Sequence, residues 1–174
     1  IVFVAFGTLV QLTPNFLQAL VEGMKSEHFD VLWSLKPDRR PKDIGIPETF
    51  RMESYVPQRA VLVHPSVKLF VLHCGMNSIS ESMIAGKPML GIPIFGDQHY
   101  NSARIHDLKI GLRLDKAKLS SNQVKACVDR LLNEPQFLEA ARQASKVIRC
   151  TGGRKRAADI LEETLELGIR HLVP

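Results

Sequence analysis

A buried strand that runs straight into the start of a helix constrains this chain more than any other feature of its sequence. The apolar, β-branched and aromatic run at 67–72 stops at the small and polar residues of 73–78, and residues suited to a helix follow. The first backbone N–H groups of a helix have no intrahelical partner and carry partial positive charge. A strand that leads into such a helix start is therefore a candidate phosphate-binding site.

The boundaries of this helix can be estimated from local signals. Ser78 and Glu81 have the S-x-x-E spacing of a capping box, which predicts that the helix starts at Asn77 or Ser78. Gly86, followed by Pro88, is expected to end it. Asn77 and Glu81 then lie one turn apart on the face where a ligand would sit.

A second apolar run, at 89–95, also ends in small and polar residues: Gly96, Asp97 and Gln98. Two consecutive strands are thus expected to end in polar residues on the same edge of the sheet. In an open parallel sheet, ligands bind at that edge.

The stretch 55–98 contains an ordered series of short motifs with fixed spacing. They are an aromatic-x-P-Q opening at 55–58, L-x-H-P at 62–65, H-C-G-x-N-S at 73–78, Glu81, G-x-P at 86–88 and a final D-Q at 97–98. This series resembles the signature of the family 1 UDP-glycosyltransferases, inverting enzymes of the GT-B fold that move a sugar from UDP-sugar to small lipophilic acceptors. F-G-T at 6–8 resembles the start of the C-terminal half of these enzymes, so the resemblance covers nearly all 174 residues.

The remaining elements follow from hydrophobic periodicity and capping signals. Strands are expected at 1–6, 31–35, 50–55 and 111–114, a surface loop at 36–47, and helices at 13–26, 60–63, 100–108, 120–133, 135–150 and 154–167. Thr13 is a predicted N-cap, and Ser120 with Gln123 forms a second predicted capping box. This alternation predicts an α/β fold: one Rossmann-like, doubly wound parallel sheet with helices on both faces and a helical C-terminal tail.

The composition is ordinary for one soluble globular domain, with 45% hydrophobic and 24% charged residues. The net charge of +5 is spread, and its densest cluster, at 154–156, is interpreted as a solvated helix start or as a contact to phosphate or acidic lipid, not to nucleic acid. Three cysteines indicate reduced thiols, with Cys127 and Cys150 packed in helices. No apolar run reaches the roughly 20 residues needed to span a bilayer, and no signal peptide is recognised.

The resemblance implies a UDP-binding site with residues from several segments. Its members are Gly7, Thr8, Tyr55, Val56, Gln58, His73, Gly75, Asn77, Ser78 and Glu81. Tyr55 would stack on uracil, Glu81 would accept hydrogen bonds from the ribose hydroxyls, and His73 would donate to the diphosphate. Asp97 and Gln98 would bind the hydroxyls of the transferred sugar, and the Gln98 amide can both donate and accept.

Each candidate residue also has a purely structural interpretation, which the sequence leaves open. Tyr55 suits a half-buried aromatic at a strand end, and the pair at 7–8 suits a plain turn. Asn77 and Ser78 can be caps only, the pair at 97–98 can simply start a helix, and His64 is interpreted as structural. Asn101, one turn beyond Asp97, is expected to support the pocket. A zinc site from His73, Cys74, Asp97 and His99 matches no known ligand spacing.

The resemblance places the catalytic base in a separate N-terminal acceptor domain, so it implies no catalytic residue in this chain. The expected partners are UDP and UDP-sugar, that N-terminal domain and a small-molecule acceptor, with no cofactor and no metal. Because the chain begins in a strand, we expect it to be a soluble C-terminal donor domain, 1–174, that does not span a membrane. The segment 168–172 resembles the region before the membrane anchor of animal members, which leaves open an endoplasmic reticulum or a cytoplasmic location for the parent.

The sequence leaves three alternatives to this function. One is the donor domain of another GT-B or nucleotide-sugar enzyme, such as a UDP-N-acetylglucosamine transferase or an epimerase; the uninterrupted motif spacing argues against it. Another is a Rossmann dehydrogenase domain, which is disfavoured because no G-x-G-x-x-G follows the first strand. A non-catalytic nucleotide-binding module is the third.

Overall fold

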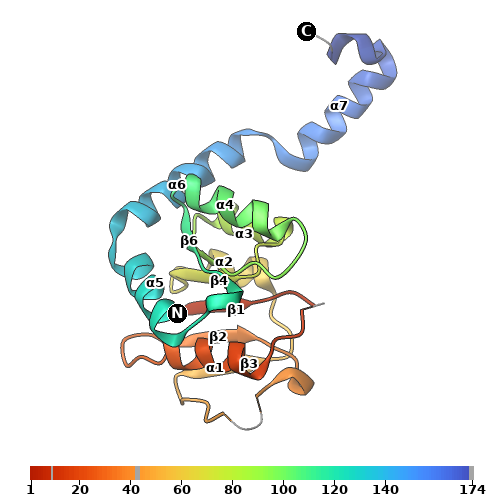
Figure 1. The fold of residues 1–174 in the computed structure, drawn as a ribbon. Coiled ribbons are helices and arrows are strands. Elements are labelled where there is room, and N and C mark those ends of the chain that lie inside the picture. Colours follow the sequence, from red (N-terminus) through yellow and green to blue (C-terminus); the bar gives the residue numbers. More distant parts are fainter. Residues whose placement is uncertain (9, 42–43, 173–174) are drawn as a thin grey trace.

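The computed structural model describes residues 1–8, 10–41 and 44–172. Within these residues, six parallel strands form one sheet in the order β3-β2-β1-β4-β5-β6 (Figure 1). The strands are β1 (Val2–Ala5), β2 (Val31–Ser34), β3 (Phe50–Glu53), β4 (Leu69–Leu72), β5 (Met89–Gly91) and β6 (Gly111–Arg113). The strand order reverses between β1 and β4, which confirms the predicted doubly wound sheet.

Helices cover both faces of the sheet. They are α1 (Pro14–Gly23), α2 (Gln58–Val63), α3 (Met76–Ala85), α4 (Gln98–Asp107), α5 (Ser121–Asn133), α6 (Pro135–Cys150) and α7 (Gly153–Leu167), with 3₁₀ turns η1 (Pro37–Arg39), η2 (Lys116–Lys118) and η3 (Ile169–Leu172). Figure 1 shows α7 extending away from the sheet, and the helix has no buried residue among those described.

The alternation of side chains along the buried strands creates two core clusters, one on each face. Val2 and Val4 face one side, where Leu20 of α1 and Val124 of α5 pack on the sheet. On the other side, Phe3 stacks on Phe70 with ring centroids 5.0 Å apart, and α2, α3 and α4 supply the apolar cover. The strands therefore end at one edge of a sheet that is packed on both faces.

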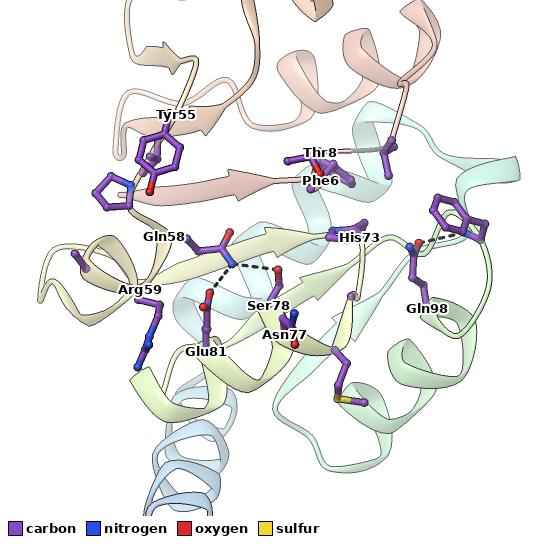
Figure 2. A pocket seen from close by; sticks show the side chains of 18 residues that line it. Phe6, Thr8, Tyr55, Gln58, Arg59, His73, Asn77, Ser78, Glu81 and Gln98 are labelled. Atoms are coloured by element: carbon purple, nitrogen blue, oxygen red, sulfur yellow. Dashed lines mark hydrogen bonds between the residues drawn. The ribbon is translucent and has the colours of Figure 1, made fainter. Parts of the chain in front are cut away.

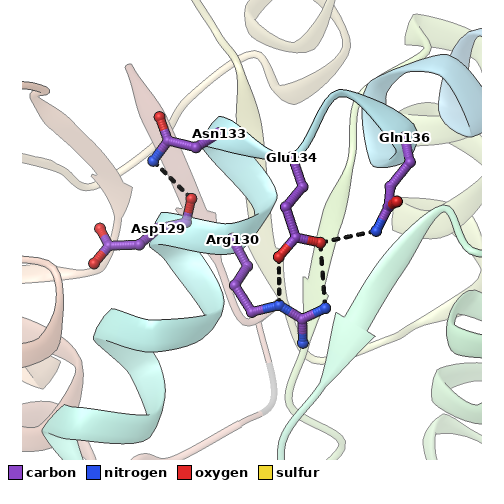
Figure 3. A network of polar contacts seen from close by, with 5 residues as sticks. All are labelled: Asp129, Arg130, Asn133, Glu134 and Gln136. Atoms are coloured by element: carbon purple, nitrogen blue, oxygen red, sulfur yellow. Dashed lines mark hydrogen bonds and ion pairs between the residues drawn. The ribbon is translucent and has the colours of Figure 1, made fainter.

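A polar network closes the junction between α5 and α6 (Figure 3). The Arg130 Nε atom lies 2.7 Å from Glu134 Oε1, and the Gln136 side chain donates to Glu134 Oε2 at 2.8 Å. These groups are largely exposed to solvent, so the network fixes a turn geometry more than it stabilises the fold.

Several helices and strands are shorter than the sequence predicted. The first helix ends at Gly23 rather than near 26, and the strand expected at 89–95 stops at Gly91. Pro93 follows closely and has no N–H to donate to a ladder, which accounts for the short strand. The predicted surface loop at 36–47 contains η1, and its residues 42–43 lie outside the described part of the chain.

The predictions for the C-terminal region are confirmed only in part. Cys127 packs against the core as expected, whereas Cys150 is exposed at the end of α6 and the prediction that it packs was wrong. Arg154, Lys155 and Arg156 are exposed in the first turns of α7, as expected for a solvated helix start. None of the described helices combines the length and apolar character needed to cross a bilayer.

Candidate functional site

A cavity of about 880 Å³ opens at the carboxyl edge of the sheet, next to the point where the strand order reverses (Figure 2). Its walls come from the segments that follow β1, β3 and β4 and from the loop before α4. All ten residues that the sequence assigned to UDP line this one cavity: Gly7, Thr8, Tyr55, Val56, Gln58, His73, Gly75, Asn77, Ser78 and Glu81. Gln98 lines it as well, whereas Asp97 does not.

The chain turns sharply between β4 and α3. Cys74 has a left-handed backbone with φ of 65°, and Gly75 is the N-cap of a helix that begins at Met76. Ser78 is therefore inside the helix, and the prediction of an Asn77 or Ser78 start with an S-x-x-E capping box was wrong. Gly75 has no side chain to cap the helix, so the first N–H groups of α3 remain available to a ligand at the cavity wall.

His73, the first residue after β4, is half-buried in this wall. A Cβ atom on Gly75 would lie 2.7 Å from His73 Nε2, and one on Gly7 would lie 3.0 Å from the same atom. Gly7 also has a φ of 70°. The two glycines thus make room for the imidazole, which fits between the β1 and β4 loops.

Burial lowers the pKa of His73, while the neighbouring Ala5 carbonyl and the charge of Asp97 act in the opposite direction. The Nδ1 atom of His73 is buried and has no hydrogen-bond partner among the described residues. The accessible edge of the ring consequently carries Nε2. At neutral pH the ring is uncharged and can present one N–H donor to the cavity.

Gln58 connects α2 to α3 across the cavity. Its Nε2 atom donates to Ser78 Oγ at 3.1 Å and to Glu81 Oε2 at 2.7 Å (Figure 2). This long-range contact uses the two side chains that the capping-box prediction had assigned to the helix start. Glu81 Oε1 makes no hydrogen bond within the described residues, so it can accept from a ligand.

Tyr55 follows β3 and is 80% exposed, so the half-buried interpretation of this residue was wrong. Val56 beside it is buried and fixes the segment to the core. Figure 2 shows the Tyr55 ring and Gln98 toward opposite sides of the group, with His73 between them. An exposed ring next to a cavity provides a flat surface for stacking.

Gln98 is only 4% exposed, and its side-chain oxygen accepts from the backbone N–H groups of Ile94 and Phe95 at 2.8 and 3.1 Å. The expectation that this amide both donates and accepts toward a ligand was therefore wrong: its oxygen is used to hold the loop after β5. The amide nitrogen remains as a donor at the cavity.

Asp97 is exposed and caps no N–H group of α4. Asn101 donates to Asp97 Oδ2 at 2.7 Å and to the Cys74 carbonyl at 3.1 Å. Asn101 thereby links the Asp97 loop to the turn that carries His73, as expected of a supporting residue. A role of Asp97 toward a sugar stays a prediction.

The sequence interpretation missed several residues of the cavity wall. Phe6, Val10, Arg59, Met76 and Phe95 all line it. Arg59 directly follows Gln58 at the start of α2, so its position in the motif could have identified it. His64 does not line the cavity and accepts from the Ser66 N–H, in keeping with a structural role. In the described parts of the chain, no three His, Cys, Asp or Glu side chains are grouped as metal ligands.

A family model described as UDP-glucoronosyl and UDP-glucosyl transferase matches residues 1–150. The chain is 32% identical to UDP-glycosyltransferase 1 of Phaeomoniella chlamydospora, over 95% of this chain and 37% of the relative. It is 37% identical to a flavonol 3-O-glucosyltransferase of Actinidia chinensis, over 78% of this chain and 31% of that enzyme. It thus spans about a third of the length of these curated relatives.

Solved structures agree in fold. The glycotransferase of kitacinnamycin superposes with a TM-score of 0.84 and 28% identity, covering 93% of this chain and 42% of that one. A UDP-glucose:anthocyanidin 3-O-glucosyltransferase solved in complex with UDP superposes with a TM-score of 0.77 and 28% identity, over 85% of this chain and 35% of that one.

Proposed function

We propose that this chain, which belongs to the UDP-glucoronosyl and UDP-glucosyl transferase family, binds the UDP-sugar donor of a glycosyl transfer reaction. Its fold is the Rossmann-like half of a GT-B glycosyltransferase. One observation carries the proposal: ten residues from three separate segments, selected by their motifs, converge on a single cavity at the reversal of strand order.

The nucleoside would lie between α2 and α3. Tyr55 offers its exposed ring to uracil, and Glu81 offers a free carboxylate oxygen to the ribose hydroxyls. Gln58 holds the other oxygen of Glu81 and so fixes the direction of the free one. A carboxylate held in this way distinguishes a ribonucleotide from its deoxy form, because the deoxy sugar leaves it without a partner.

The diphosphate would lie at the start of α3. No side chain caps the first N–H groups of this helix, and they line the same cavity as the His73 ring, which lies close to Gly7 and Gly75. As the bond from sugar to diphosphate breaks, negative charge grows on the β-phosphate, and donors already in place stabilise that charge. We expect no metal ion or cofactor, because these donors and the helix start supply the needed positive potential.

The transferred sugar would extend from His73 toward the loop before α4. There, the Asp97 carboxylate and the Gln98 amide nitrogen are available to hydroxyl groups. Relatives of the chain are named as glucosyltransferases and as glucuronosyltransferases, so the donor is proposed to be a UDP-hexose, with UDP-glucose preferred.

We further propose that acceptor and catalytic base belong to a separate N-terminal domain of the parent protein. The chain spans about a third of its curated relatives, so those enzymes contain much sequence that has no counterpart here. A small lipophilic acceptor hydroxyl would meet the donor in the cleft between the two domains. The parent would be anchored in the endoplasmic reticulum membrane or cytoplasmic.

Calorimetric titration tests the donor-binding proposal. The chain should bind UDP and UDP-glucose with dissociation constants between micromolar and millimolar, or about 4 to 8 kcal/mol. NAD and uridine serve as controls, and UDP-glucuronate compares the second sugar. The absence of binding at millimolar UDP, or tighter binding of NAD than of UDP, would contradict the proposal.

A further inference from the structure

Arg39 ends η1, in the connection between β2 and β3, and contacts the loop that follows β1. Its Nη1 atom donates to the Thr8 carbonyl at 2.9 Å and to the Val10 carbonyl at 3.0 Å. The two loops meet because β1 and β2 are neighbours in the sheet and both end at the same edge. One guanidinium nitrogen thus bridges two peptide groups that are 31 and 29 residues away in sequence.

The loop that Arg39 contacts forms one wall of the cavity. Gly7, Thr8 and Val10 line it, and Gly7 lies against the His73 ring. Val10 is also held by its side chain, which is buried in the core, whereas Thr8 is exposed. Within the described residues, no hydrogen bond other than that from Arg39 attaches Thr8 to the rest of the protein. Arg39 thus ties the Thr8 peptide to the connection between β2 and β3.

We propose that Arg39 is a positioning residue, which holds the loop after β1 in the shape that receives the diphosphate of the donor. This inference rests on the proposed function. Arg39 acts through the loop, since its Nη1 atom is already bonded to the two carbonyls. Because a peptide unit is planar, fixing a carbonyl fixes the whole unit. Without Arg39 the loop must be ordered when the ligand binds, and that ordering opposes binding.

The neighbouring residue provides a matched control. Arg40 is half-buried like Arg39, but its guanidinium donates to the carbonyls of Leu35 and Met52, at 3.4 and 2.7 Å. It thus attaches the same connection to β2 and β3, and within the described residues it donates no hydrogen bond to the loop after β1. Both substitutions remove one arginine charge and two hydrogen bonds to backbone carbonyls, and they differ in whether the loop after β1 or the strands β2 and β3 lose those bonds.

The test compares UDP with uridine in the 174-residue chain. Arg39→Ala should weaken UDP binding by about 5- to 30-fold, less than deletion of a charge-assisted hydrogen bond to the ligand would, because Arg39 acts through the loop. Uridine binding should change less than about twofold. Arg40→Ala should change both affinities by less than about twofold. Arg39→Lys should fall between wild type and Arg39→Ala, because a single ammonium nitrogen can donate to both carbonyls from a shorter stem.

Hydrogen–deuterium exchange reports the local order of the loop after β1, which a melting temperature does not. Without ligand, the segment 6–17 should exchange faster in Arg39→Ala than in wild type, and at the wild-type rate in Arg40→Ala. Melting temperatures are measured for each variant, and Arg39→Gln replaces Arg39→Ala if the latter does not fold.

Unchanged UDP affinity in Arg39→Ala would overturn the inference while leaving the proposed function intact. Equal losses for UDP and uridine would also overturn it, since they would indicate a general structural role. If the wild-type chain itself failed to bind UDP, the proposed function would fail first, and the inference with it.

Discussion

Replacing Gly75 by alanine tests whether the position of the His73 ring matters for binding. Gly75 has φ of −66° and ψ of 136°, values that any residue adopts, so alanine brings no backbone strain. The new Cβ would lie 2.7 Å from His73 Nε2, closer than a Cβ atom is found to such a neighbour, so the imidazole must move. The substitution thus displaces one donor without removing it.

The size of the effect follows from the contact that is lost. A hydrogen bond to a charged group contributes about 1.5–3 kcal/mol, so His73→Ala should weaken UDP binding about 10- to 150-fold. Gly75→Ala moves the ring instead of deleting it and should cost about 5- to 50-fold. Uridine, which has no phosphate, should bind nearly as before in both variants. The free energy of unfolding should change little, because two effects of similar size oppose each other. Alanine is a poorer N-cap than glycine, which destabilises the folded chain, but it also lowers the conformational entropy of the unfolded chain, which favours folding.

The two substitutions form a double-mutant cycle, measured by calorimetry with UDP and uridine. Once the imidazole is removed, the alanine at 75 has nothing to displace, so the double variant should bind UDP as His73→Ala does. Losses that simply add would show that Gly75 acts on the ligand directly and would refute the reasoning. Normal UDP binding by Gly75→Ala would also refute the reasoning.

The remaining predictions concern other parts of the cavity and the pH dependence of the fold. Gln58→Ala frees the Glu81 carboxylate and should reduce the preference for UDP over 2′-deoxy-UDP by about 3- to 10-fold in competition titrations. Asp97→Ala and Gln98→Ala should each leave UDP affinity near normal and weaken UDP-glucose about 5- to 150-fold; equal loss for both ligands would assign the pair a structural role. Burial lowers the pKa of His73, so the unfolded chain binds more protons than the folded one between that lowered pKa and about 6.5. The free energy of unfolding, measured by urea titration, should therefore fall as the pH drops below about 6.5, and His73→Asn should reduce this dependence. The chain alone should transfer no glucose from UDP-glucose to phenol or flavonoid acceptors, and product above background would contradict the placement of the base in another domain.

Features set by neighbouring residues could be predicted from the sequence. Thr13 accepts from the Phe16 N–H and Ser120 from the Gln123 N–H, as their capping signals indicated. The left-handed Gly86 ends α3 as expected, because only the local backbone decides that choice. The doubly wound parallel sheet also followed from the alternation of strands and helices.

Features set by distant residues could not be predicted. The capping box predicted at the start of α3 does not form, and Gln58, 20 residues before Ser78, binds both side chains that were assigned to it. Gln98 was expected to use its oxygen on a ligand, but the fold brings the Ile94 and Phe95 N–H groups to it. A motif identifies which residues gather at a site, and the fold decides which of their atoms remain free.

The central claim is that UDP binds between Tyr55 and the start of α3. A crystal structure of the chain grown with UDP tests it most directly. The account predicts uracil against the Tyr55 ring, a phosphate oxygen within hydrogen-bonding distance of His73 Nε2 and of the first N–H groups of α3, and ribose at Glu81. UDP bound elsewhere, such as in the groove over β2 and β3, or its diphosphate turned away from His73, would contradict it.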